Sequence, residues 1–173
     1  TSYRVPRYDG VDDFLSIADL GIFRNVEEGS LFTVSRKLSV PTSPELLFAA
    51  GIGTNVTSVR ITVSVSSLGN VFFSRRTDSE AFTSISLPAS TGYFSMSNVS
   101  IYKNGIYNGF SDGIKTANVL FPSGSGLSSD TNSSFVGIGA RGLGDLSFDG
   151  IISVSCADRS SFTTEQINAL RDL

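Results

Sequence analysis

The chain has no histidine, no tryptophan and only one cysteine among its 173 residues. Without histidine, neither a His-based catalytic triad nor a His-based zinc site can form. A single cysteine excludes a disulfide within the chain. The missing tryptophan removes a side chain that readily stacks on a sugar ring. These absences exclude many classes of enzyme.

Charged side chains are also scarce, at 17% of residues with a net charge of −3. The lysines and arginines are scattered, so neither a nucleic acid nor an anionic membrane has electrostatic support as a partner. No apolar run reaches the roughly 18 residues that a membrane span needs, and no signal peptide is visible. We therefore predict no nucleic-acid partner and no membrane insertion.

The sequence does contain many short strand patterns. The clearest is SVRITVSVS at residues 58–66, in which every second residue is valine or isoleucine. Further candidates, separated by Gly, Ser, Pro or Asn, cover residues 31–38, 46–51, 70–77, 81–87, 95–103, 106–110, 117–121 and 135–140. Strands at this density indicate a sandwich or a barrel. The length predicts a single domain over residues 1–173, large enough to bury about 70% of its unfolded surface.

Two connections between these strands have distinct signatures. Asn104 and Gly105 predict a two-residue type I′ hairpin, because both central positions need positive φ. Residues 122–134, PSGSGLSSDTNSS, predict a long flexible loop.

The end of the chain combines a strand with a capped helix. Thr163 and Gln166 have the spacing of a capping box, and Phe162 and Ile167 that of a hydrophobic staple, so a short helix is expected to start here and dock on a sheet. In the strand before it, alternation predicts a core face that ends in a buried Cys156. That face comprises Phe148, Gly150, Ile152, Val154 and Cys156.

Three stretches together resemble a known family: RYDGVDDFLSI (7–17), VSIYKNGIYNG (99–109) and FDGIISVSCADRSSFTTEQINAL (148–170). They are similar to the opening strand, the Asn-Gly hairpin and the closing strand with helix of laminin-G-like, concanavalin A-like domains. The resemblance implies an all-β, two-sheet antiparallel jelly-roll sandwich with a short C-terminal helix. This fold hosts lectins, glycosidases, adhesion modules and structural parts. Similar modules occur on bacteriophage tail and head-surface proteins, which share the Ser/Thr/Gly-rich, cysteine-poor composition.

Glycoside hydrolysis is the chemistry to test first for this fold. It needs two carboxylates flanking the scissile bond, and the glycosidases that this chain resembles carry alternating acidic residues on a strand. No such run is present; Asp78 and Glu80 are the nearest pair by spacing and fall in a predicted turn. Asp12 and Asp13 are adjacent, which predicts that they point to opposite faces. We predict no catalytic residue and no enzyme activity.

Calcium stays an alternative for this family. Laminin-G-like domains sometimes hold calcium with aspartates and carbonyls, and Asp112 and Asp145 could contribute, although no Asp-x-Asp-x-Asp loop exists. We predict no metal site and no cofactor.

Antiparallel strands that run up and down place alternate connections at opposite ends of a sandwich. Counted from the strand at 58–66, the loops 67–69, 88–94, 111–116 and 141–145 share one end. That end combines an aromatic face with charged groups that form hydrogen bonds, as a polar sugar ligand requires. The predicted ligand-binding residues are Tyr93, Asp112, Lys115, Arg141 and Asp145.

The leading hypothesis is a non-catalytic virion-surface module that attaches to a glycan or cell-surface receptor through this end. The alternative is a purely structural virion component that decorates or assembles a tail or head by packing against neighbouring subunits. A glycoside hydrolase is a distant third. The expected partners are a glycan or receptor and other virion subunits in a multimeric assembly, at a virion surface or in an extracellular setting.

Overall fold

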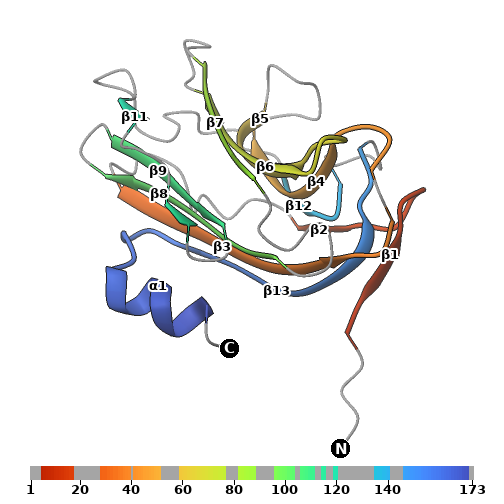
Figure 1. Ribbon diagram of the computed structural model, residues 1–173. Helices are drawn as coiled ribbons and strands as arrows, with labels where there is room; N and C mark the ends of the chain where they lie inside the picture. Colours follow the sequence, from red (N-terminus) through yellow and green to blue (C-terminus); the bar gives the residue numbers. More distant parts are fainter. Residues whose placement is uncertain are drawn as a thin grey trace, which may run out of the picture.

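The computed structural model describes residues 5–17, 28–39, 41–51, 59–76, 82–88, 96–103, 106–111, 114–115, 119–120, 135–140 and 146–171. These residues form two antiparallel sheets that face each other and one helix, which lies against the outside of one sheet (Figure 1). The predicted fold class, an all-β antiparallel sandwich of two sheets with a short C-terminal helix, is confirmed.

Sheet A has seven strands in the order β1-β13-β3-β8-β9-β10, and β11 also pairs with β9. The bounds are β1 Arg7–Asp9, β3 Glu28–Lys37, β8 Met96–Lys103, β9 Ile106–Ser111, β10 Ile114–Lys115, β11 Val119–Leu120 and β13 Asp149–Asp158.

Sheet B has six strands in the order β2-β12-β4-β5-β6-β7. The bounds are β2 Leu15–Ile17, β4 Glu45–Gly51, β5 Val59–Val65, β6 Asn70–Arg76, β7 Phe82–Pro88 and β12 Phe135–Ile138. The opening stretch 7–17, which resembled one strand motif, therefore supplies a short strand to each sheet.

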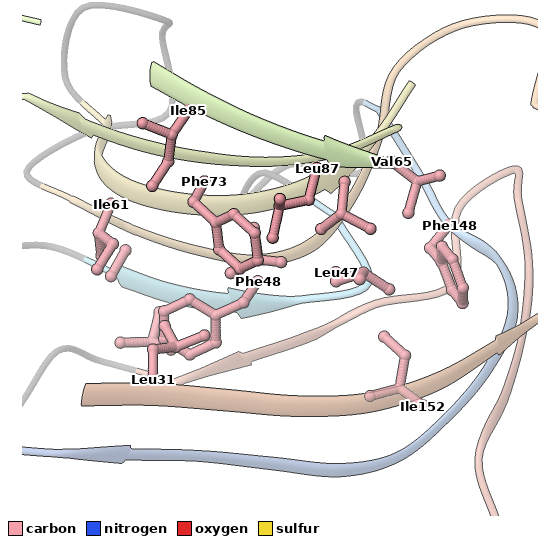
Figure 2. Close-up of a cluster of buried hydrophobic side chains, with 14 of the residues drawn as sticks. Leu31, Leu47, Phe48, Ile61, Val65, Phe73, Ile85, Leu87, Phe148 and Ile152 are labelled. Atoms are coloured by element: carbon pink, nitrogen blue, oxygen red, sulfur yellow. The ribbon is translucent and has the colours of Figure 1, made fainter. Parts of the chain in front are cut away.

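The core fills the space between the sheets (Figure 2). Ile61, Val63 and Val65 of β5 are buried in it, as their alternation predicts. Phe73 of β6 reaches across to sheet A, where a Cβ on Gly109 would lie 2.5 Å from its ring. A glycine at this position of β9 therefore lets the two sheets approach each other.

The helix α1 (Thr164–Arg171) begins as the sequence predicts. The Thr163 N–H donates to Gln166 Oε1 over 2.8 Å, and the Gln166 N–H donates to Thr163 Oγ1 over 3.3 Å, which completes the capping box. Phe162 and Ile167 pack in one apolar cluster with Phe32 of β3, so the helix is docked on the outer face of sheet A.

The closing strand departs from the predicted alternation. The pairing of β13 with β3 shifts by one residue between Ile152 and Val154, because Ser153 forms a β-bulge. Beyond the bulge the strand turns its other side to the core, so Val154 and Cys156 are exposed. The prediction of a buried Cys156 was therefore wrong. Desolvation, followed by the charge of Asp158, raises the pKa of the thiol, so Cys156 is not an activated nucleophile.

Two predicted connections are only partly covered by the described residues. The β8–β9 register pairs Lys103 with Ile106, which fits a two-residue connection; Asn104 and Gly105 themselves lie outside the described residues, as does the predicted loop 122–134. Among the residues that the structure describes, no helix has both the length and the hydropathy to cross a bilayer.

Candidate functional site

The predicted ligand site lies at one end of the sandwich, which we call the loop end. β4 begins opposite the end of β5, where Glu45 pairs with Val65, and the β5–β6 turn follows at the same level. β13 begins opposite the end of β3, where Gly150 pairs with Lys37. These ladders bring both sheets to a common edge, from which the described strands lead into the loops that the prediction groups together.

The predicted ligand-binding residues are mostly outside the described part of the chain. Tyr93, Asp112, Arg141 and Asp145 lie there, and Lys115 is described only by its backbone pairing with Phe110. The structure thus leaves this set a prediction.

The loop end contains a buried ion-pair network that joins the two sheets. The Lys37 side chain, from the end of β3, is fully buried, and its Nζ lies 2.5 Å from Glu45 Oε2 of β4. The same Nζ donates to the carbonyl oxygen of Asp149 over 2.8 Å and lies 3.5 Å from Ser39 Oγ. It also lies 5.2 Å from the centroid of the Phe148 ring.

Each donor of the Lys37 ammonium group has an oxygen partner, which is what a buried charge requires. Glu45 Oε2 also accepts the N–H of Asp149 over 3.0 Å, and Ser39 donates to the Asp149 carboxylate. The sequence carried a signal for this network, because Lys37 alternates with Leu31, Thr33 and Ser35 on the inner face of β3.

A second charged group lies in the loop between β1 and β2. One carboxylate oxygen from each of Asp9, Asp12 and Asp13 lies within 4.8 Å of the other two, and all three residues are exposed. Asp9 Oδ1 accepts the N–H of Val11 over 2.9 Å, and this bond is the main reason why the pKa of Asp9 is lowered. Gly10 takes a positive φ of 79° in this turn, where a side chain would be strained.

This arrangement corrects the prediction that Asp12 and Asp13 point to opposite faces. The alternation rule holds for extended strands, whereas Asp12 ends a bend at residues 10–12 and Asp13 follows it before β2 begins. Within the described residues, this is the only group of three acidic side chains close enough to share an ion. Calcium takes roughly six to eight oxygens, from carboxylates, carbonyls and water, and exposed acidic groups of this kind are common without an ion. Asp112 and Asp145, the predicted calcium ligands, lie outside the described residues.

Two apolar side chains are exposed at the loop end, and one of them, Val11, belongs to the acidic turn. Val11 of the β1–β2 loop is 71% exposed, and Leu68 of the β5–β6 turn is 84% exposed. The Ser147 hydroxyl donates to the carbonyl of Val11 over 3.1 Å, which ties this loop to the segment before β13. The described part of the loop end thus offers carboxylate oxygens next to apolar surface, a combination found in binding sites for polar ligands with apolar faces.

No family model and no curated protein matches the chain by sequence. By structure it is similar to the CBM40 domain of the IT-sialidase from Ruminococcus gnavus, a carbohydrate-binding module. The TM-score is 0.74 at 20% identity, and the match covers 95% of this chain and 97% of the other. The fold that the two share is a β-sandwich of two antiparallel sheets. Structures of the R. gnavus module bound to α2,3- and α2,6-sialyllactose match this chain as well.

Other proteins share the fold at lower identity. A leech intramolecular trans-sialidase matches with a TM-score of 0.72 at 17% identity, covering 98% of this chain but 29% of the enzyme. A SAP-like pentraxin from Limulus polyphemus matches with a TM-score of 0.70 at 14% identity, covering 95% of this chain and 80% of the pentraxin. The chain thus spans one part of the trans-sialidase and nearly all of the R. gnavus module.

Proposed function

We propose that this chain is a non-catalytic carbohydrate-binding module that attaches to a glycan on a cell surface. The observation that carries the proposal is its similarity, over nearly the full length of both chains, to the CBM40 module whose structures contain sialyllactose. Sialylated oligosaccharides are therefore the first ligands to test.

The proposal is for binding without catalysis. The match covers 97% of the R. gnavus carbohydrate-binding module. It covers only 29% of the leech trans-sialidase. The chain has no histidine, and Asp78 and Glu80, the nearest acidic pair by spacing, lie outside the described residues. The carboxylate of Glu45 is paired with Lys37 between the two sheets.

The charge of the loop end restricts how an acidic sugar would bind. Asp9, Asp12 and Asp13 are exposed and close together, so they repel the carboxylate of a sialic acid. A sialylated ligand would therefore bind away from this turn and beside a cation. Arg141 and Lys115 are the predicted cations for that role.

We further propose that the module is displayed in many copies on a virion surface or in another extracellular setting. The composition, rich in Ser, Thr and Gly with one cysteine, resembles that of bacteriophage tail and head-surface modules. An open sugar site loses much of its hydrogen-bond energy to water, since each net bond is worth about 0.5–1.5 kcal/mol. Many copies acting together would then supply tight attachment.

A glycan array tests the proposal. The domain is presented in multivalent form on sialylated and neutral oligosaccharides, with Tyr93→Ala and Arg141→Ala beside it. We expect binding to a defined group of glycans and weaker binding by both variants. A folded domain that binds nothing on the array would overturn the proposal.

A structural role in a virion, such as decoration or assembly of a tail or head, is the second candidate. Val11 and Leu68 are the most exposed large apolar side chains among the described residues, and packing against a neighbouring subunit would bury them. Light scattering separates the two functions. Assembly predicts oligomers that Leu68→Ser dissociates, whereas glycan attachment predicts that Leu68→Ser leaves the mass unchanged.

A further inference from the structure

The outer face of sheet B presents an unusual set of side chains over β5, β6 and β7. In these strands Val63, Val71 and Leu87 point into the core, so their neighbours in sequence point outward. The outward positions whose side chains the structure describes carry one aromatic ring among hydroxyl and other uncharged groups. They are Thr62, Ser64, Asn70, Phe72, Ser74, Ser84, Ser86 and Pro88. The side chains of Arg60, Arg76 and Phe82, which belong to the same strands, are outside the description.

The strand registers arrange these positions in rows. Phe72 pairs with Ser64 on one side and Ser86 on the other. In the next row Ser74 pairs with Thr62 and with Ser84, and the hydroxyls of Ser74 and Ser84 lie 3.1 Å apart. The side-chain positions around Phe72 on this face are therefore mostly serine and threonine, which carry hydroxyl groups.

This face is open to solvent. Phe72 and Ser74 are half-buried, whereas Ser84 and Ser86 are exposed. The helix α1 packs against part of the outer face of the other sheet (Figure 1). Among the described residues, no helix lies over β5–β7.

Packing and propensity do not account for these residue types. Serine is not among the residues that favour strands, and its hydroxyl competes with backbone hydrogen bonds. Exposed surfaces of soluble domains usually carry charged groups of both signs, yet the eight outward positions with described side chains are uncharged, a set that leaves out Arg60 and Arg76. Where local choices depart from what the fold favours, function is the expected reason.

The chemistry of the face matches a sugar. A ring such as Phe72 packs against the apolar side of a pyranose, and hydroxyls on either side donate to and accept from its hydroxyl groups. The positions from Ser84 to Pro88 span about 14 Å along β7, and the three strands span about 10 Å across. This area exceeds a single sugar ring and suits an oligosaccharide.

We propose that the outer face of sheet B, centred on Phe72, is the binding platform for an extended oligosaccharide. The proposal rests on the glycan-binding function proposed above and names a site for it in the described residues. The platform continues to the loop end, because Asn70 and Pro88 lie at the β5–β6 turn and at the start of the loop 88–94. A glycan on the platform can therefore extend toward that end.

Variants on the two sheets test the platform. The wild-type domain is first screened on the multivalent array, and the best glycan is then titrated. Phe72→Thr removes the ring and Ser84→Val removes a hydroxyl, each with a residue that favours strands. The matched control is Val154→Thr, an exposed apolar residue on the outer face of sheet A.

We expect Phe72→Thr and Ser84→Val each to weaken binding by about 2- to 12-fold, which corresponds to one aromatic contact or one hydrogen bond. Phe72→Tyr keeps the ring and should weaken binding less than Phe72→Thr. Val154→Thr should leave binding unchanged. Thermal melts show whether each variant is folded, and amide chemical-shift mapping of the wild type locates the ligand without any substitution.

The outcomes separate this inference from the proposed function. If a glycan binds, but Phe72→Thr and Ser84→Val bind it as well as wild type and the shifted amides lie outside β5–β7, the platform is wrong and the function stands. If the wild type binds no glycan, both are wrong.

Discussion

Lys37 is the residue whose surroundings differ most from what its type usually adopts. It carries a positive charge into the space between the sheets and has no exposed side-chain surface. Such a charge is tolerated because Glu45 supplies the opposite charge and the carbonyl of Asp149 and the hydroxyl of Ser39 supply further partners. Removing one partner leaves the other buried without compensation.

We therefore predict that Lys37→Met lowers the free energy of unfolding by about 3–5 kcal/mol. Glu45→Gln in the same chain should restore much of the loss, because it removes the uncompensated charge and keeps an acceptor for the Asp149 N–H. Urea denaturation of the single and double variants measures both effects.

Arg36→Met is the matched control, since Arg36 is the neighbouring residue of β3 and is exposed. It should change stability by about 0.5 kcal/mol or less. A Lys37→Met variant as stable as Arg36→Met would contradict the account of the network.

At the level of elements, α1 depends on its cap. Thr163 is exposed, so its side chain stabilises the fold through its Oγ1, which accepts the N–H of Gln166; the bond from the Thr163 N–H to Gln166 does not depend on this side chain. Thr163→Ala should cost about 1 kcal/mol, which lowers the thermal midpoint of a domain of this size by about 2–4 °C. Phe162→Ser should cost more, because Phe162 is half-buried against the same cluster as Ile167.

Thr164→Ala controls for the loss of a threonine, because Thr164 is exposed within the first turn and alanine favours helices. It should leave the melting midpoint unchanged or raise it. Equal effects at residues 163 and 164 would show that the cap contributes nothing.

The sequence predicted the elements where a local signal was sufficient. The alternation in β5, the capping box of α1 and the length of the β8–β9 connection are all set by neighbours in the chain, and the structure agrees with each. Cys156 was misplaced because the bulge at Ser153 arises from pairing with β3, which is distant in sequence. The prediction for Asp12 and Asp13 was wrong because side chains alternate between faces only along extended strands, and these residues lie at the bend between β1 and β2.

The candidate site was less predictable for a related reason. Parity of up-and-down strands indicated which strand ends meet, and the ladders agree. Lys37 and Glu45 meet across two sheets, and the hydroxyl rows of sheet B need the registers of three strands. These contacts depend on how segments distant in sequence pair with each other, so no pattern in the local sequence predicts them.

At the level of the whole molecule, acid should destabilise the fold. The pKa of Asp9 is lowered from its ordinary value of 3.8, mainly by the N–H of Val11, and the pKa of Asp158 is lowered mainly by the hydroxyl of Ser160. A carboxyl with a lowered pKa in the folded state contributes stability above its unfolded value of 3.8, and this contribution is lost as the pH falls through the folded pKa.

We therefore predict that the free energy of unfolding declines as the pH falls below about 4. Asp9→Asn, which cannot titrate at this position, should show a shallower decline than wild type. Urea denaturation at a series of pH values from 7 to about 2.5 measures both curves. Parallel curves would show that Asp9 titrates alike in the folded and unfolded chain.

The bulge at Ser153 has a consequence for how this chain is compared with others. One inserted residue shifts the phase of a two-residue repeat by half a period, so the core pattern of β13 before Ser153 becomes its surface pattern after it. An alignment that allows no gap at this position matches the interior of one chain with the exterior of another from Val154 onward. Two such strands can therefore match in structure while their sequences are aligned one residue out of register.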